Sequence, residues 1–190
     1  MRQAFLGLAG LIAIIAAFVL VRPDVLERLG EQPVLEGQVQ HFAATRTLRA
    51  TPDLAWRDID GNDVRIVDFA GKVLLVNFWA TWCAPCVREL PSMNRLQAKL
   101  AAEGLQVVAI NVDTGGRYAA EPYVQRLALD RLSLYLDPRS AVSRAMGVSV
   151  MPTSFLIDRR GREIGRLEGG AEWDSDEAVA LIRYYLRRAA

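Results

Sequence analysis

The sequence predicts a domain of the α/β class, because a buried strand leads directly into a pair of cysteines and an amphipathic helix follows them. The apolar run 73–78 shows no alternation of polar and apolar residues, which is typical of a parallel strand covered on both faces. After the cysteines, apolar residues recur at spacings of three and four, the period of a helix with one buried face. Further strand and helix patterns continue to the C-terminus and support this class.

The N-terminal part predicts a membrane anchor and a tether. Residues 4–21 carry no charge and would span about 27 Å as a helix, just enough for the apolar core of a bilayer. We expect residues 1–22 to form an uncleaved anchor, because the run is longer than the apolar region of a usual signal peptide and no clear cleavage site follows it; a cleaved signal peptide is the alternative. Residues 23–50 are polar and weakly patterned, and we interpret them as a linker.

Residues 51–190 are expected to form one globular domain. It opens with a hairpin, in which strands at 54–59 and 64–66 flank the turn signal Asp60-Gly61-Asn62-Asp63. The elements predicted after the central strand are a helix at 83–103, a strand at 105–111, a helix at 121–129, a strand at 134–136, a helix at 139–146, strands at 153–158 and 163–168, and a final helix at 174–188.

The charge of the chain is balanced, with 23 basic and 22 acidic residues and a net charge of +1. This composition gives no reason to expect a nucleic-acid partner or a strong field for charged substrates.

Cys83 and Cys86 are the only cysteines, and their spacing is Cys-x-x-Cys. The first turn of a helix has unpaired N–H groups and the positive end of the helix dipole, and both stabilise an anion. We therefore expect the pKa of the Cys83 thiol to be lowered and its thiolate to be nucleophilic near neutral pH. Cys86, one turn further on, is within reach to close a disulfide.

A zinc site and an inert structural disulfide are the less favoured interpretations of the cysteine pair. A zinc site usually needs four ligands, and the chain offers only the two cysteines and the distant His41 in the predicted linker. A structural disulfide across so short a loop would add little stability. We interpret Cys83 and Cys86 as a redox-active dithiol, and we expect no metal and no further cofactor.

The string FWATWCAPC at 78–86 resembles the active site of thioredoxin-fold proteins. Its continuation VRELP at 87–91 is similar to membrane-anchored thiol–disulfide oxidoreductases of the TlpA/ResA/CcmG type. The resemblance runs from about residue 51 to the C-terminus. It implies a thioredoxin fold, a central mixed sheet flanked by helices, with an N-terminal β-hairpin and a central helix–strand insertion.

The resemblance also implies roles for single residues. Cys83 would attack a client disulfide, and Cys86 would resolve the mixed disulfide. Met151-Pro152-Thr153 resembles the cis-proline loop that faces the cysteines and pairs with an extended client, so we expect a cis bond before Pro152. The other predicted client-binding residues are Trp82, Ala84 and Pro85.

Glu89 lies three residues after Cys86, so the two share a helix face. Proteins of the ResA type carry a glutamate at this spacing, where it would raise the pKa of Cys86 and could relay its proton. A solvated surface glutamate without a role is an equal alternative. Asn77 stands where classical thioredoxins commonly have a buried aspartate, and an asparagine cannot carry a proton.

The resemblance implies a reductant of specific extracytoplasmic disulfides, held at the inner (cytoplasmic) membrane by residues 4–21 with its domain facing the periplasm or cell exterior. Expected partners are apocytochrome c or copper-assembly proteins as clients, and a membrane electron donor of the DsbD/CcdA type. Two alternatives stay open, a copper-binding assembly factor and a disulfide-forming oxidase on the same fold. The uncharged Ala84-Pro85 dipeptide favours the reducing direction.

Overall fold

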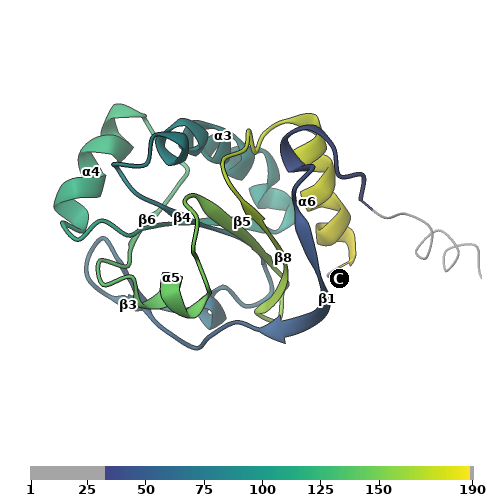
Figure 1. Ribbon diagram of the computed structural model, residues 1–190, viewed down its shortest axis with the longest axis horizontal. Coiled ribbons are helices and arrows are strands. Elements are labelled where there is room, and N and C mark those ends of the chain that lie inside the picture. The colour runs from purple at the N-terminus through teal and green to yellow at the C-terminus, as the bar shows by residue number, and fades with distance from the viewer. Residues whose placement is uncertain (1–32, 189–190) are drawn as a thin grey trace, which may run out of the picture. The chain divides into compact units, whose positions relative to one another are not determined.

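The computed structural model describes residues 33–188 (Figure 1). The predicted anchor, residues 1–22, and the first part of the predicted linker lie outside the described residues. Within 33–188, no helix is both long enough and apolar enough to cross a bilayer. The chain from Val34 onward forms a compact unit of its own.

An eight-stranded sheet runs through this unit in the order β1-β8-β7-β4-β5-β6-β2-β3. The strands are β1 (Ala43–Ala50), β2 (Trp56–Asp58), β3 (Asp63–Val64), β4 (Val73–Trp79), β5 (Leu105–Asn111), β6 (Leu134–Leu136), β7 (Thr153–Ile157) and β8 (Arg162–Glu168). β4 pairs in parallel with β5 and antiparallel with β7, so the sheet is mixed, as predicted. All seven residues of β4 are buried, which explains why its sequence shows no alternation.

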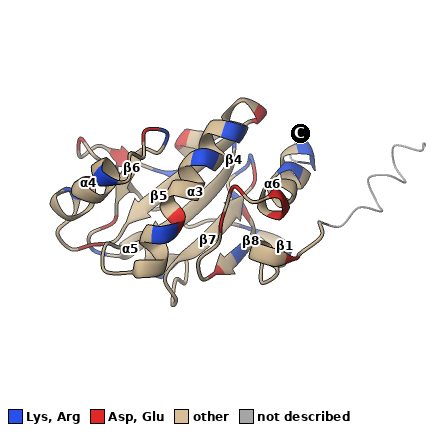
Figure 2. Ribbon diagram, turned by 90° about the horizontal axis from the view of Figure 1, so that it is seen from above, with Lys and Arg blue, Asp and Glu red and all other residues tan. Residues whose placement is uncertain are grey.

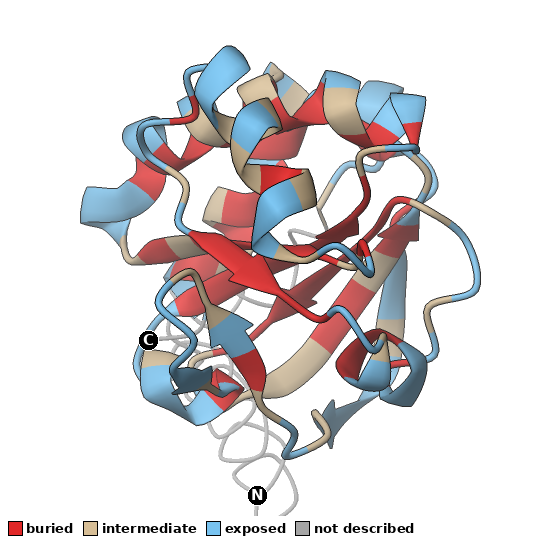
Figure 3. Cartoon of the chain, turned by 90° about the vertical axis from the view of Figure 1, so that its left-hand side faces the viewer, coloured by how far each residue is buried: buried red, intermediate tan, exposed pale blue. Residues whose placement is uncertain are grey.

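Helices cover both faces of the sheet. The described helices are α3 (Ala84–Leu100), α4 (Arg117–Arg126), α5 (Ala141–Ala145) and α6 (Asp176–Arg188), with short 3-10 helices η1 (Gly37–Val39), η2 (Ile66–Phe69) and η3 (Ala101–Glu103). Buried residues of α3 and α6 share one apolar cluster with Leu75 and Leu156 of the sheet. Those of α5 and η2 share a second cluster with Leu74 and Phe155. α3 and α6 therefore cover one face and α5 the other, with buried strands between them (Figures 1 and 3).

Seen from above, α3 lies over the sheet, and basic and acidic residues are interspersed on the helices and loops around it (Figure 2). This distribution agrees with the balanced charge of the sequence.

The predicted N-terminal hairpin and central insertion are both present. β2 and β3 pair antiparallel. α4 and β6 form the insertion, and β6 joins β5 in parallel and β2 antiparallel. The predicted helix at 83–103 is α3 followed by η3, whereas the helix predicted at 121–129 begins earlier, at Arg117.

The prediction that residues 23–50 form a linker is wrong for its C-terminal part, because the domain begins before residue 51. Residues 43–50 form β1, an edge strand antiparallel to β8. Val39 and Phe42 anchor the segment in the core, but most side chains of β1 are exposed, so no apolar alternation marks the strand. Gly165 of β8 lets the two backbones approach, because a Cβ there would lie 2.6 Å from the carbonyl oxygen of Ala43.

Candidate active site

The cysteine pair lies where β4 has ended and α3 begins. Cys83 is the N-cap residue of α3, and the backbone N–H of Cys86 donates a hydrogen bond to Cys83 Sγ at 3.3 Å. The two sulfurs form a disulfide, with 5.3 Å between the Cα atoms. Cys83 is 6% exposed and Cys86 is fully buried. Cys83 is therefore better suited than Cys86 to be the attacking group, because its sulfur lies at the helix N-terminus, which stabilises a thiolate, and because it is the more accessible of the two.

The loop that leads into Cys83 is held by Asp113, a residue that sequence reasoning missed. The carboxylate of Asp113 accepts hydrogen bonds from the N–H and the hydroxyl of Thr81, at 2.8 and 3.1 Å. Asn111 donates a further bond to the same carboxylate and accepts one from the Asp113 N–H. Asn111 is the strand neighbour of Trp79, so parallel pairing of β4 and β5 places Asp113 beside this loop. A lone aspartate after a strand gives no sequence signal of this contact.

The Met151–Pro152 peptide bond is cis, which confirms the expectation. Thr153, the next residue, is the strand neighbour of Phe78, so this loop lies at the same end of the sheet as the cysteines. The Thr153 hydroxyl donates to the carbonyl of Val150 at 2.7 Å, and the Pro152 carbonyl accepts the N–H of Gly169. These two hydrogen bonds hold the loop to Val150 at its start and to Gly169, the residue after β8.

The predicted client-binding residues on the cysteine side are open to solvent. Trp82 is 70% exposed, and Ala84 and Pro85 are exposed as well. On the facing loop, Met151 is half-buried, whereas Pro152 and Thr153 are buried. Trp82, next to Cys83, and Val150, two residues before Pro152, are both large exposed apolar side chains. Their roles in client binding stay predictions.

Glu89 is buried, so the alternative of a solvated surface glutamate is wrong. It is 2% exposed, and three N–H groups donate to its carboxylate. They come from the Asn77 side chain at 2.8 Å, the Ala171 backbone at 3.0 Å and the Trp173 indole at 3.3 Å. Burial raises the pKa of Glu89 to about 7, although these hydrogen bonds oppose the shift. Glu89 can therefore exchange a proton near neutral pH.

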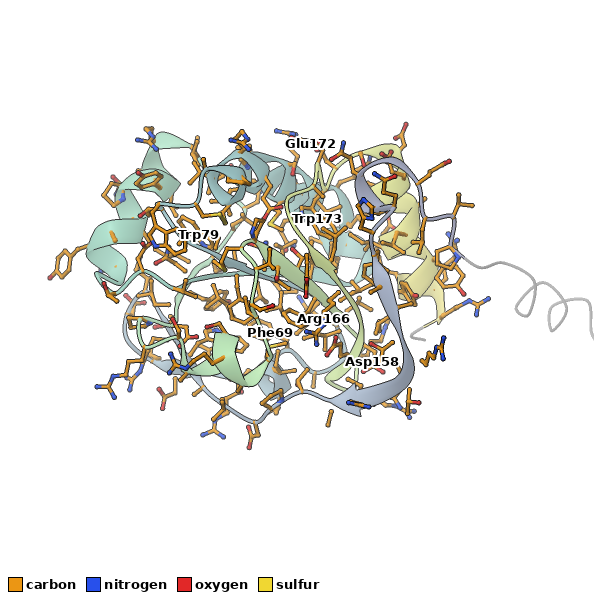
Figure 4. All side chains as sticks on the ribbon, in the orientation of Figure 1. Phe69, Trp79, Asp158, Arg166, Glu172 and Trp173 are labelled. Carbon is orange, nitrogen blue, oxygen red and sulfur yellow. A yellow bond between two sulfur atoms is a disulfide. The ribbon has the colours of Figure 1, made fainter. Side chains whose placement is uncertain are left out.

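A pocket of about 320 Å³ opens beside Glu89 and Pro85. Its wall includes Gln38, whose side-chain oxygen accepts the N–H of Glu172 at 3.1 Å. Glu172 lies at the upper edge of the molecule in Figure 4, and the buried Trp173 points inward below it. The segment predicted as a linker thus contributes a side chain to the surroundings of Glu89.

The described part of the chain contains no group of three or more His, Cys, Asp or Glu side chains that could hold a metal ion. His41 is exposed in the turn after η1.

Together, this fold and this cysteine pair are those of a thioredoxin-like protein thiol–disulfide oxidoreductase. Residues 48–162 match the AhpC/TSA family, and the chain belongs to that family.

Relatives with assigned names agree with this class. The chain is 37% identical over 111 residues to the thiol-disulfide oxidoreductase ResA of Geobacillus thermodenitrificans, a match that covers 58% of this chain and 63% of the relative. It is 33% identical over 121 residues to ResA of Bacillus thuringiensis, covering 64% of this chain and 69% of that one. The crystal structure of a candidate thiol:disulfide interchange protein DsbE from Chlorobium tepidum superimposes with a TM-score of 0.65 at 35% identity, covering 75% of this chain and 97% of that one.

Proposed function

We propose that this protein reduces disulfide bonds in specific partner proteins, with Cys83 as the attacking residue and Cys86 as the resolving residue. The observation that carries the proposal is the position of Cys83 at the N-terminus of α3, where the Cys86 N–H already donates to its sulfur. A thiolate at this position is stabilised by the same N–H group and by the helix dipole.

The reaction runs in two exchanges. The Cys83 thiolate attacks one sulfur of the client disulfide, a bond forms between them, and the other client sulfur leaves as a thiolate that takes up a proton. Cys86 then loses its proton and attacks Cys83 Sγ, the mixed disulfide breaks, and the second client sulfur leaves as a thiolate. Two electrons pass to the client, and the protein is left with the Cys83–Cys86 disulfide.

Glu89 is our candidate for the group that takes the proton of Cys86. It shares a helix face with Cys86, and its pKa of about 7 lets it act as a base at neutral pH and release the proton afterwards. The asparagine at position 77 cannot perform this step, so Glu89 fills the role of the aspartate of classical thioredoxins.

The oxidised protein needs an external dithiol to start a new cycle. We propose a membrane electron donor of the DsbD/CcdA type, and apocytochrome c or copper-assembly proteins as clients. The uncharged run 4–21 would hold the protein at the inner membrane, with the domain facing the periplasm or cell exterior. The names of the ResA relatives, thiol-disulfide oxidoreductases, support the reaction class.

The reduction potential of the full chain tests the direction of electron flow. The protein is equilibrated with glutathione or dithiothreitol mixtures and read by tryptophan fluorescence, to which Trp82 beside the disulfide contributes. We expect a value near or below about −220 mV, the range of glutaredoxins and thioredoxin. A value near about −120 mV would contradict the proposal and indicate a disulfide-forming oxidase.

A further inference from the structure

A second pocket, of about 240 Å³, opens at the end of the sheet opposite the cysteines. Leu74, near the start of β4, lines this pocket, whereas the cysteines follow Trp79, the last residue of the same strand. The seven residues of β4 span about 20 Å, so the pocket is separate from the active site. In Figure 4, Phe69 and Asp158, which both line the pocket, lie in the lower half of the molecule, and Glu172 lies at the upper edge.

Most of the wall of this pocket is apolar. The end of β1 with the residues after it, η2 with the residues after it, and the turn between β7 and β8 meet there. The apolar wall residues are Ala50, Pro52, Ile66, Val67, Phe69, Ala70 and Leu74. Pockets for drug-sized molecules begin at about 300 Å³, so this one suits a smaller ligand with an apolar part.

The two acidic residues of the wall already have cationic partners. Asp53 pairs with Arg65 at 3.1 Å, and Asp158 pairs with Arg162 at 2.7 Å. Neither of these two arginines lines the pocket. The ion pairs reduce the negative field that the two carboxylates would otherwise produce in the pocket.

The basic residues of the wall are less well satisfied. Among the described residues, the exposed side chains of Lys72 and Arg160 have no ion-pair or hydrogen-bond partner. Arg159 donates from Nη2 to the carbonyl of Leu186 at 3.3 Å, but its Nε is buried and has no partner in this part of the chain. An unpaired buried donor costs free energy. The wall therefore offers positive charge and N–H donors that the described chain does not use itself.

We propose that this pocket binds a small organic acid, whose apolar part lies in the pocket and whose carboxylate lies against Lys72 and Arg160. An inorganic anion would leave the apolar wall in contact with water, and a neutral apolar molecule would leave the two cations without a partner. Because the pocket and the disulfide lie at opposite ends of the sheet, the bound acid leaves the disulfide accessible to a client. The site does not depend on the direction of disulfide exchange.

The test compares three probes on the full chain, held in nanodiscs of phosphatidylcholine, a lipid without net charge. The probes are 4-phenylbutyrate, the neutral 4-phenyl-1-butanol, and acetate, which has the charge without the apolar part. Binding is followed by NMR of the methyl groups of Ile66, Val67 and Leu74. Methyl groups of Leu90 and Leu96, which belong to the apolar cluster on the other face of the sheet, are the internal control.

We expect 4-phenylbutyrate to shift the pocket methyl signals until saturation and to leave the control signals unchanged. It should bind about tenfold more tightly than the alcohol, because hydrogen bonds to charged groups are the stronger ones. Acetate should not shift these signals at the same concentrations. Equal affinities of the acid and the alcohol, equal shifts with acetate, or no binding of any probe would overturn the proposal.

The Val67→Glu variant tests the role of charge without disturbing the core, because Val67 is 63% exposed. The new carboxylate should weaken the binding of 4-phenylbutyrate about tenfold and change that of the alcohol little. Val67→Gln, the matched control, has the same shape without the charge and should keep the preference for the acid. An equal loss of acid binding in both variants would contradict the role of charge.

The double variant Lys72→Gln, Arg160→Gln removes the two unpaired cations. The acid and the alcohol should then bind with similar affinity. Lys99→Gln is the control, because Lys99 is exposed on α3 and does not line the pocket, and it should keep the full preference for the acid. An undiminished preference in the double variant would show that these two side chains do not hold the carboxylate.

An anionic lipid is the other source of an apolar group that carries an acid, and nanodiscs that contain phosphatidylglycerol distinguish it. If they shift the same methyl signals without any probe, the occupant is a membrane lipid and the proposal of a free acid is wrong. The reduction potential separates this proposal from the proposed function. An oxidising potential with intact probe binding would overturn only the function, and a reducing potential without probe binding would overturn only the site.

Discussion

Cys83, Cys86 and Glu89 lie within two turns of one helix, yet their surroundings differ in ways that separate their chemistry. Cys83 is the N-cap residue of the helix and lies near the surface, whereas Cys86 and Glu89 are buried in the interior. A client sulfur can therefore reach Cys83 first, and Glu89 lies on the same helix face as Cys86, whose proton we propose it receives. The proposed order of the two exchanges rests on this arrangement.

The order of attack can be tested by removing each sulfur. In Cys86→Ser, Cys83 still attacks but nothing resolves the product, so a mixed disulfide with a client should accumulate. In Cys83→Ser, the remaining Cys86 is buried and no adduct should form. Non-reducing electrophoresis and mass spectrometry of the adduct distinguish the two variants. Equal adduct yields would mean that Cys83 is not the preferred nucleophile.

Glu89 also makes the stability of the oxidised protein depend on pH. Its pKa is about 7 in the folded state against 4.5 for an ordinary glutamate. Between these values the folded state binds more protons than the unfolded state, so stability falls as the pH rises from about 4.5 to about 7. The loss at pH 8 amounts to about 3 kcal/mol. Urea unfolding at pH 5 and pH 8 measures most of this loss.

The Glu89→Gln variant should lack most of this pH dependence, because its side chain does not titrate. Glu172→Gln serves as the matched control, since Glu172 is exposed and its replacement should leave most of the dependence in place. If the native protein and Glu89→Gln lose equal stability between the two pH values, burial has not raised the pKa of Glu89.

At the scale of elements, the ends of neighbouring strands assemble the site. Trp79 of β4, Asn111 of β5 and Thr153 of β7 lie at the same end of the sheet by strand register. The loops that follow β4 and β5 and precede β7 therefore meet there. Asp113 then joins two of these loops through Thr81. The short helix η1, which precedes the edge strand β1, carries Gln38, and Gln38 lines the pocket beside Glu89.

The docking of β1 depends on the absence of a side chain at Gly165. In Gly165→Ala, the new Cβ would meet backbone atoms of Ala43 and Ala44 at 2.6 and 2.9 Å, so the strand has to shift. We expect a loss of about 1–3 kcal/mol in the free energy of unfolding, the usual cost of overpacking. Gly170→Ala is the matched control, because its Cβ would make only ordinary contacts of 3.6 Å or more. Equal urea midpoints for both variants would contradict the close approach of β1 and β8.

At the scale of the whole domain, β4 is the strand around which both apolar clusters are built. Val73, Leu75 and Trp79 point to the cluster under α3 and α6, and Leu74, Val76 and Phe78 point to the other. The β2–β3 pair, by contrast, lies at the edge of the sheet and is short. Stability should therefore be unevenly distributed across the sheet.

Hydrogen exchange measures that distribution. We expect amides of β4 and of its neighbours β5 and β7 to exchange slowest, at rates set by global unfolding, because opening them exposes both clusters. Amides of β3 should exchange much faster, through local opening of the edge. Protection of β3 equal to that of β4 would mean that the hairpin and the core open as one unit.

The sequence by itself determined the class of the domain, the position of the cysteines at the start of α3, and most of the strands and helices. These features are local: an apolar run, a helical period and a Cys-x-x-Cys spacing are contained within a few adjacent residues. The cis bond before Pro152 was predictable only through resemblance to a known family, since most bonds before proline are trans.

Only the tertiary structure decided what surrounds those residues. Glu89 is buried beside Ala171 and Trp173, residues more than eighty positions away whose N–H groups donate to its carboxylate, and burial raises its pKa although these hydrogen bonds oppose the shift. β1 became a strand because Gly165 admits its backbone, although the side chains of β1 show no buried face. Periodicity records which side of an element is buried, but hydrogen bonds between distant segments leave no local pattern. The pairing of Asn77 with Glu89 could therefore be recognised only after the strand and the helix had been brought together.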